Sequence, residues 1–132
     1  MELSYSLANA IMNDGVTIQI PAGTTFSMTI KITKNGTPYR LFSGDIIAFG
    51  AKRSLSEVSF IIYKELTSSD YSEDDGGYVL TLDTSDTNIS AMRYYYDIGL
   101  KTSTGDFYKI VPTSLLKVTE NVVNEEDVGN DN

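Results

Sequence analysis

Four acidic residues form the densest group of potential metal ligands in the sequence, directly before Gly76-Gly77: Asp70, Glu73, Asp74 and Asp75. Calcium takes about six to eight oxygen ligands, and a loop rich in carboxylates beside glycines can supply several of them. The spacing differs from that of an EF-hand loop, which places ligands at alternate positions and a glutamate at its end. We therefore expect a solvated loop without a high-affinity calcium site, and the four residues are only weak metal candidates.

Paired carboxylates are the other chemistry to consider, because two carboxyl groups held about 5–10 Å apart can hydrolyse a glycosidic bond. The chain has 18 acidic residues, so some pairs will meet this distance by chance. Asp97 has the most apolar neighbours, Tyr96 and Ile98, but the alternation of its strand points it outward. The sequence has no His, Cys or Trp, which excludes His-based triads, cysteine nucleophiles, disulfides and the usual zinc, haem and iron–sulfur sites. We expect no catalytic residues, no cofactor and no enzyme activity.

The tyrosines are a third candidate, above all the run Tyr94-Tyr95-Tyr96. Exposed tyrosine rings can stack on sugars or bases, and they also suit strand cores and protein interfaces. On a strand, Tyr94 and Tyr96 share one face while Tyr95 points to the other. The pattern favours core packing with one exposed ring, and ligand stacking stays open as the alternative.

The charge balance excludes two classes of partner. Ten Lys and Arg residues against 18 Asp and Glu residues leave a net charge of −8. Such a surface repels phosphate backbones and anionic lipids, and the basic residues are scattered apart from Lys52-Arg53. No apolar run approaches the roughly 18–20 residues that a membrane span needs, and the N-terminus lacks a basic region before an apolar run. We expect no nucleic-acid partner, no membrane partner and no signal peptide.

Apolar and polar residues alternate with a period of two through most of the chain, which indicates short β-strands. Turn residues recur roughly every 8–12 positions, the spacing typical of a sandwich or barrel. The connection 83–92 has room for one helical turn, with Ser85 or Asp86 as its N-cap. The sequence thus predicts an antiparallel β-sandwich of about eight strands with at most one short helical turn. The predicted strands are 16–20, 26–32, 39–42, 46–52, 58–63, 78–82, 94–100 and 107–118, the last interrupted or bulged at Pro112.

Three regions follow from this pattern. Residues 1–15 form an arm that is either a helical turn or a docking strand, residues 16–119 form the sandwich, and residues 120–132 form an acidic, disordered tail. The period-two positions predict the core. Its expected members are Ile18, Phe26, Met28, Ile30, Phe49, Phe60, Ile62, Leu80, Leu82, Tyr96, Ile98 and Leu100.

One predicted strand has apolar residues on both faces. In 58–64, Ile61 and Tyr63 lie opposite the face of Phe60 and Ile62, and Tyr95 likewise points away from its own core face. Exposed apolar surface of this kind usually marks a protein contact. We predict an interface that contains Ile61, Tyr63 and Tyr95. The alternative is that Ile61 and Tyr63 are covered by the N-terminal arm or the acidic loop of the same chain.

The order of these parts resembles a known group of proteins. The segments that carry the likeness are Pro21-Ala22-Gly23-Thr24, the strand 25–30, the Asn35-Gly36 turn, 43–53, 78–87 and 95–100. They resemble small immunoglobulin-like β-sandwich proteins of phages and prophages of Gram-positive bacteria, including the N-terminal domain of phage baseplate upper proteins. The stretch from Leu82-Asp83 to Tyr94 also resembles the tyrosine corner of immunoglobulin sandwiches, although it is longer than usual.

The resemblance implies a virion component of the tail, baseplate or neck, made in the bacterial cytoplasm and without catalysis. Its partners would be other virion proteins and further copies of itself in a homo-oligomer. The alternative is a module that binds carbohydrate or a host surface through exposed tyrosines.

Overall fold

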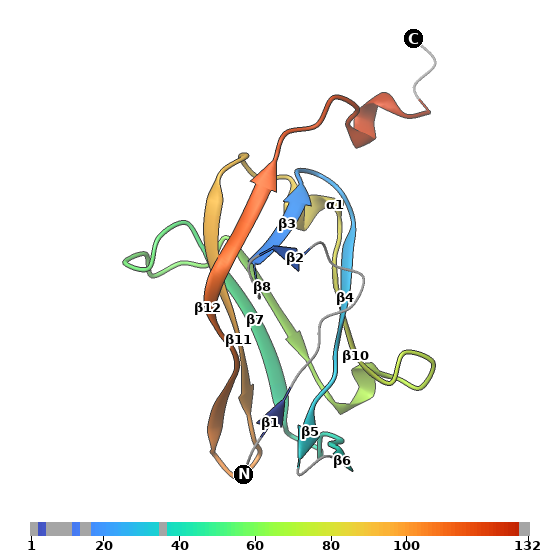
Figure 1. Cartoon of the computed structure of the whole chain (residues 1–132), viewed down its shortest axis with the longest axis vertical. Coiled ribbons are helices and arrows are strands. Elements are labelled where there is room, and N and C mark those ends of the chain that lie inside the picture. Colours follow the sequence, from blue (N-terminus) through green and yellow to red (C-terminus); the bar gives the residue numbers. More distant parts are fainter. Residues whose placement is uncertain (1–2, 5–11, 14–16, 35–36, 130–132) are drawn as a thin grey trace.

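The computed structural model describes residues 3–4, 12–13, 17–34 and 37–129, and in this part of the chain two β-sheets pack face to face (Figure 1). The large sheet has the strand order β2-β3-β12-β11-β7-β8 and the small sheet the order β4-β10-β9. A further small ribbon, β1-β5-β6, lies at one end. The strands of the large sheet are β2 (Met12–Asn13), β3 (Thr17–Pro21), β7 (Ile46–Lys52), β8 (Ile62–Leu66), β11 (Arg93–Lys101) and β12 (Phe107–Thr119). The others are β4 (Phe26–Ile30), β9 (Tyr71–Ser72), β10 (Gly77–Leu82), β1 (Leu3–Ser4), β5 (Thr33–Lys34) and β6 (Thr37–Pro38).

The connections are those of an immunoglobulin sandwich. The chain crosses from β4 in the small sheet to β7 in the large one, returns from β8 to β9, and crosses again from β10 to β11. Strands β4, β10 and β9 correspond to B, E and D of that fold, and β12, β11, β7 and β8 to G, F, C and C′. All pairings are antiparallel except that of β3 with β12. The all-β, immunoglobulin-like class predicted from the sequence is confirmed.

The helical turns differ from the prediction. Alongside α1 (Thr84–Thr87), the described residues contain two 3₁₀ turns, η1 (Ser68–Asp70) and η2 (Glu125–Asp127), where the sequence predicts at most one helical turn. The N-cap of α1 is Asp83, not Ser85 or Asp86. Asp83 lies one residue before the turn, and its carboxylate accepts the backbone N–H of Asp86 at 3.0 Å, as an N-cap must.

The core lies between the sheets and follows the period-two pattern. Eleven of the twelve predicted core residues are buried, all except Phe60. At the centre, Phe49 of β7 stacks on Tyr96 of β11, with ring centroids 5.4 Å apart. Period-two spacing therefore identified the inner faces of the long strands correctly.

Phe60 is 51% exposed, so its place in the predicted core is wrong. The strand begins only at Ile62, and the register pairs Ile62 with Ala51. Ile61 also donates its backbone N–H to the Ala51 carbonyl at 2.8 Å, so two residues stand opposite one. Such a bulge inserts one residue and shifts the alternation, which places Phe60 beside Tyr63 instead of inside with Ile62.

One smaller boundary also differs from the prediction. The hairpin partner of β5 is Thr37–Pro38, whereas the sequence predicts 39–42. Its turn, Asn35-Gly36, lies outside the described residues, as do residues 5–11 of the arm. Residues 107–118 form one strand that continues through Pro112 with register shifts against β11, as the bulge alternative requires. The division into arm, sandwich and tail stays a prediction.

Tyr94 anchors the corner before β11. It is buried, and its hydroxyl donates to the carbonyl oxygen of Ser90 at 2.6 Å. Burial raises the pKa of this hydroxyl, which therefore stays protonated and keeps its role as donor. This contact is the tyrosine corner that the sequence resembles.

We expect Tyr94→Phe to lower the free energy of unfolding by about 1 kcal/mol, because it removes one hydrogen bond while it keeps the ring. Urea denaturation followed by circular dichroism measures the loss. Tyr95→Phe is the matched control, since Tyr95 neighbours Tyr94 but its side chain is exposed. Equal stability of the Tyr94→Phe variant and the wild type would show that the corner bond contributes nothing.

Candidate functional site

The outer face of the large sheet carries a group of exposed aromatic side chains. We use "outer face" for the side of β12, β11, β7 and β8 that is turned away from the small sheet. Tyr63 of β8, Tyr95 of β11 and Phe107 of β12 are exposed there. Phe60 joins them from the segment before β8, with its ring centroid 4.9 Å from that of Tyr63. Four elements thus contribute aromatic rings to one surface.

A groove runs between these rings, and small residues form its floor. Three adjoining hollows of about 240, 220 and 280 Å³ make up the groove. Ala48 and Gly50 of β7 and Gly99 of β11 lie along it. A Cβ atom on Gly50 would come within 2.6 Å of the Phe60 ring, and one on Gly99 within 2.6 Å of the Phe107 ring. The two phenylalanine rings can therefore lie directly against the sheet only because these positions are glycine.

An ion pair lies in the groove. Lys109 of β12 approaches Asp97 of β11 at 3.1 Å, and Thr113 donates to the same carboxylate at 3.4 Å. The ammonium of Lys52 lies 5.0 Å from the Phe60 ring centroid, and that of Lys109 lies 5.3 Å from that of Phe107. Both distances are in the range of cation–π attraction. The groove thus combines aromatic rings with positive charge.

The hydroxyl of Tyr63 is also fixed in place, because it donates to the Glu65 carboxylate at 2.7 Å. This hydrogen bond raises the pKa of Tyr63, so the side chain stays neutral at physiological pH. The charged residues along the groove are therefore Lys52, Lys101, Lys109, Glu65 and Asp97. They carry a net charge of +1, which leaves −9 for the rest of a chain of net charge −8.

The predicted interface residues do not all lie on this face. Tyr63 and Tyr95 do, but Ile61 is half-buried and packs against the core. Sequence reasoning missed Phe60 and Phe107, together with the exposed Leu55 beside Phe60. The exposure of Phe107 could have been predicted from its outward position in an alternating strand. The exposure of Phe60 could not, because the bulge at Ile61 shifts the alternation there. That these residues form an interface stays a prediction.

The carboxylates of the acidic loop bind different partners and do not converge. Asp70 accepts the backbone N–H of Thr67 at 2.7 Å, Asp75 accepts the Ser72 hydroxyl at 2.8 Å, and Glu73 pairs with Arg40 at 3.4 Å. Within the described residues, no three acidic side chains converge on a point where a metal ion could bind. Asp70 and Asp75 stabilise local turns. That the loop, with Glu73 and Asp74, has no high-affinity calcium site stays a prediction.

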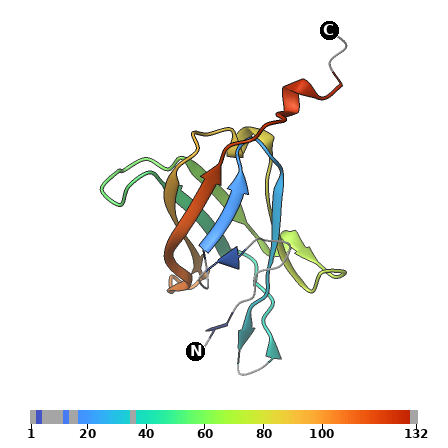
Figure 2. The ribbon, with the colours of Figure 1, turned by 45° about the horizontal axis from the view of Figure 1, so that its top comes forward.

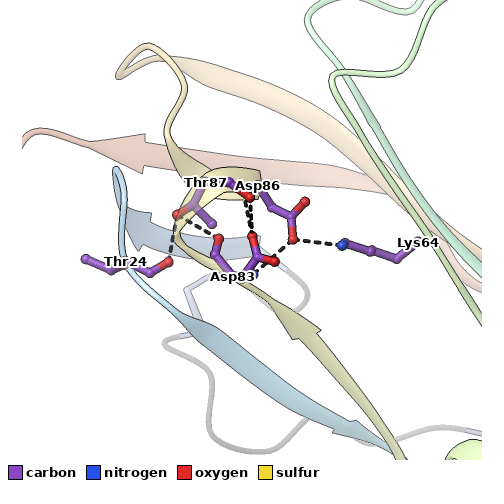
Figure 3. Close-up of polar contacts among 6 residues, drawn as sticks. Thr24, Lys64, Asp83, Asp86 and Thr87 are labelled. Atoms are coloured by element: carbon purple, nitrogen blue, oxygen red, sulfur yellow. Dashed lines mark hydrogen bonds and ion pairs between the residues drawn. The ribbon is translucent and has the colours of Figure 1, made fainter. Parts of the chain in front are cut away.

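A second charged cluster lies at α1 and holds a corner of the fold (Figure 3). Asp83 and Asp86 cap each other, since each carboxylate accepts the backbone N–H of the other residue at 3.0 or 2.9 Å. Lys64 of β8 pairs with Asp86 at 2.9 Å, which links the large sheet to the turn that follows β10. Thr87 donates to the Thr24 carbonyl at 2.6 Å.

These contacts explain the titration of the α1 cluster. The Ser85 hydroxyl, followed by the backbone N–H of Asp86, lowers the pKa of Asp83. The hydrogen bond to Asp86 raises the pKa of Lys64. Each charged group is thus held by a structural partner, and neither has the character of a proton donor or nucleophile at neutral pH.

Comparisons with known proteins point to no function. No protein-family model matches the sequence, and no curated protein is significantly similar to it. Among solved structures, one of murine CRIg aligns over 92% of this chain and 99% of its own, with 7% identity and a TM-score of 0.41. In the described residues, no helix is long and apolar enough to cross a bilayer. Function must therefore be argued from the surface.

Proposed function

We propose that this protein is a non-catalytic structural module that assembles with further copies of itself through the outer face. The proposal rests on the clustering of exposed apolar side chains on this face. Leu55, Phe60, Tyr63, Tyr95 and Phe107 all line the groove of the outer face. A contiguous exposed patch with aromatic residues is typical of a protein interface.

The charge distribution supports a second copy as the occupant. Two chains of net charge −8 repel each other over most of their surfaces. The groove, at net +1, is a region where this repulsion is absent. Association through the outer face therefore places an attractive surface against an otherwise acidic molecule.

The resemblance to phage sandwich proteins supports a setting for this assembly. We place the protein in a virion as a component of the tail, baseplate or neck, made in the bacterial cytoplasm. In such a particle many copies of one chain contact each other and other virion proteins. A non-catalytic module with exposed aromatic side chains on one sheet face suits that role.

We expect the apparent molecular mass of the wild type in sedimentation to rise as the protein concentration is raised from micromolar to millimolar levels. The variant Tyr63→Asp/Phe107→Asp should stay monomeric, because it places two carboxylates in the groove where apolar rings would be buried. The matched control is Phe42→Asp/Met92→Asp, which changes two exposed apolar residues that do not line the groove. A monomeric wild type at every concentration, or loss of association in the control alone, would contradict the proposal.

The groove itself favours a second candidate function. Tyr63, Tyr95 and the two phenylalanines offer ring faces beside Asp97 and Lys109, and aromatic rings next to polar groups can bind sugars. A glycan array probed with the wild type and with Tyr63→Ala/Tyr95→Ala separates the candidates. Glycan signals that disappear in the double variant, combined with a monomeric wild type, would make carbohydrate binding the function.

A further inference from the structure

The C-terminal tail leaves the sandwich at the end of β12 and projects away from the body (Figures 1 and 2). It holds three large apolar side chains that lie in solvent: Val122 is 97% exposed, Val123 65% and Val128 72%. Together with the outer face, the tail accounts for most exposed large hydrophobic side chains of the described residues. Large apolar side chains that stay mostly in solvent and lie close together are typical of a protein contact.

The start of the tail is fixed to the body. The backbone N–H of Ala22 donates to the Thr119 carbonyl at 2.8 Å, and the side-chain amide of Asn121 donates to the Ala22 carbonyl. Val122 and Val123 therefore begin directly after an anchored residue, and the direction in which they leave the sandwich is set.

The same chain cannot bring these valines to the centre of its own groove. Lys109 lies ten positions before Thr119 on β12, and a strand rises about 3.3 Å per residue, so about 30 Å separate them. Val123 is four positions beyond Thr119, and an extended chain spans at most about 3.6 Å per residue, or about 14 Å. Val122 or Val123 can therefore dock beside Lys109 only if it comes from another copy.

We propose that Val122 and Val123 of one copy dock between the rings of Phe60, Tyr63 and Phe107 of the next copy. Charge complementarity supports this occupant, because the tail carries Glu120, Glu125, Glu126, Asp127 and Asp131 and no basic residue. The groove presents Lys52, Lys101 and Lys109 against Glu65 and Asp97, a net charge of +1. The inference rests on the proposed function and adds which segment of the partner fills the groove.

Such a contact is head-to-tail, because each copy gives one tail and receives one. Contacts of this kind close into rings if the rotation between copies allows it, and otherwise grow into open filaments. Either form joins many copies of the chain by one repeated junction.

A mixing experiment with full-length variants tests the proposal. The tail variant is Val122→Ser/Val123→Ser, whose side chains lie in solvent, so its fold should be intact. The groove variant is Tyr63→Asp/Phe107→Asp, with Leu55→Asp as a second groove variant in an exposed segment. We expect the tail and groove variants to sediment as monomers alone. Mixed one to one, they should form a heterodimer and nothing larger, because only one intact groove and one intact tail remain.

The outcomes separate this inference from the proposed function. If the tail variant associates as the wild type does while the groove variant is monomeric, the tail is not the occupant, and assembly through the outer face stands. If the mixture gives no heterodimer although the wild type associates, the head-to-tail junction is wrong. A wild type that is monomeric at every concentration overturns the proposed function itself. Raised salt should weaken the heterodimer, since its acidic and basic groups attract each other.

Discussion

Replacing Phe49 by alanine is expected to lower the free energy of unfolding by about 3–5 kcal/mol. The ring is 1% exposed and stacks on Tyr96 at the centre of the core. Removing it leaves a cavity between the sheets, because the neighbouring strands are held by ladders on both sides and cannot close the gap. Urea denaturation at constant m-value measures the loss.

Phe60→Ala is the matched control for this prediction. It removes the same side chain, but from the outer face, where the ring is half in solvent, so we expect a loss of about 1 kcal/mol or less. Similar losses for the two variants would show that Phe60 is part of the core after all, as the sequence pattern alone suggests, and that the bulge at Ile61 is absent.

Asp45→Ala is expected to lower the free energy of unfolding by about 2–4 kcal/mol. The carboxylate is buried and accepts two backbone N–H groups, from Phe42 at 2.9 Å and from Ser103 at 2.8 Å. These bonds join the segment before β7 to the turn between β11 and β12. Alanine would remove both hydrogen bonds, and a hydrogen bond to a charged acceptor contributes more to stability than a neutral one.

Two variants check the origin of this effect by thermal or urea denaturation. Asp45→Asn keeps one side-chain carbonyl as an acceptor and should recover part of the stability. Asp106→Ala removes an exposed carboxylate in the same turn and should change little. A large loss for Asp106→Ala together with a small one for Asp45→Ala would contradict the assignment.

Much of the fold could be predicted from local sequence, because an alternating strand reports its buried face directly. Ile18, Met28, Leu80 and Ile98 follow that rule and are buried. The errors fall where one residue changes the period. The extra residue at Ile61 moved Phe60 outward, and the N-cap was placed two or three residues late because several candidate caps stand together at 83–86.

The candidate site was predicted only in part. Tyr63 and Tyr95 belong to alternating strands, so their outward direction could be read from spacing. That Phe60 and Phe107 lie with them over Gly50 and Gly99 depends on the pairing of β11 with β7 and β12. Such pairings join residues far apart in the sequence, and local periodicity carries no information about them.

The most direct test of assembly through the outer face is a dilution series of the isotope-labelled full-length protein followed by NMR. Backbone amide and aromatic shifts are compared between the associated and the dilute state. We predict that the shift changes concentrate on residues of the groove, at Phe60, Tyr63, Tyr95, Gly99 and Phe107. The shifts of the small sheet, β4, β10 and β9, should stay unchanged. Shifts that do not depend on concentration, or changes confined to β4, β10 and β9, would contradict it.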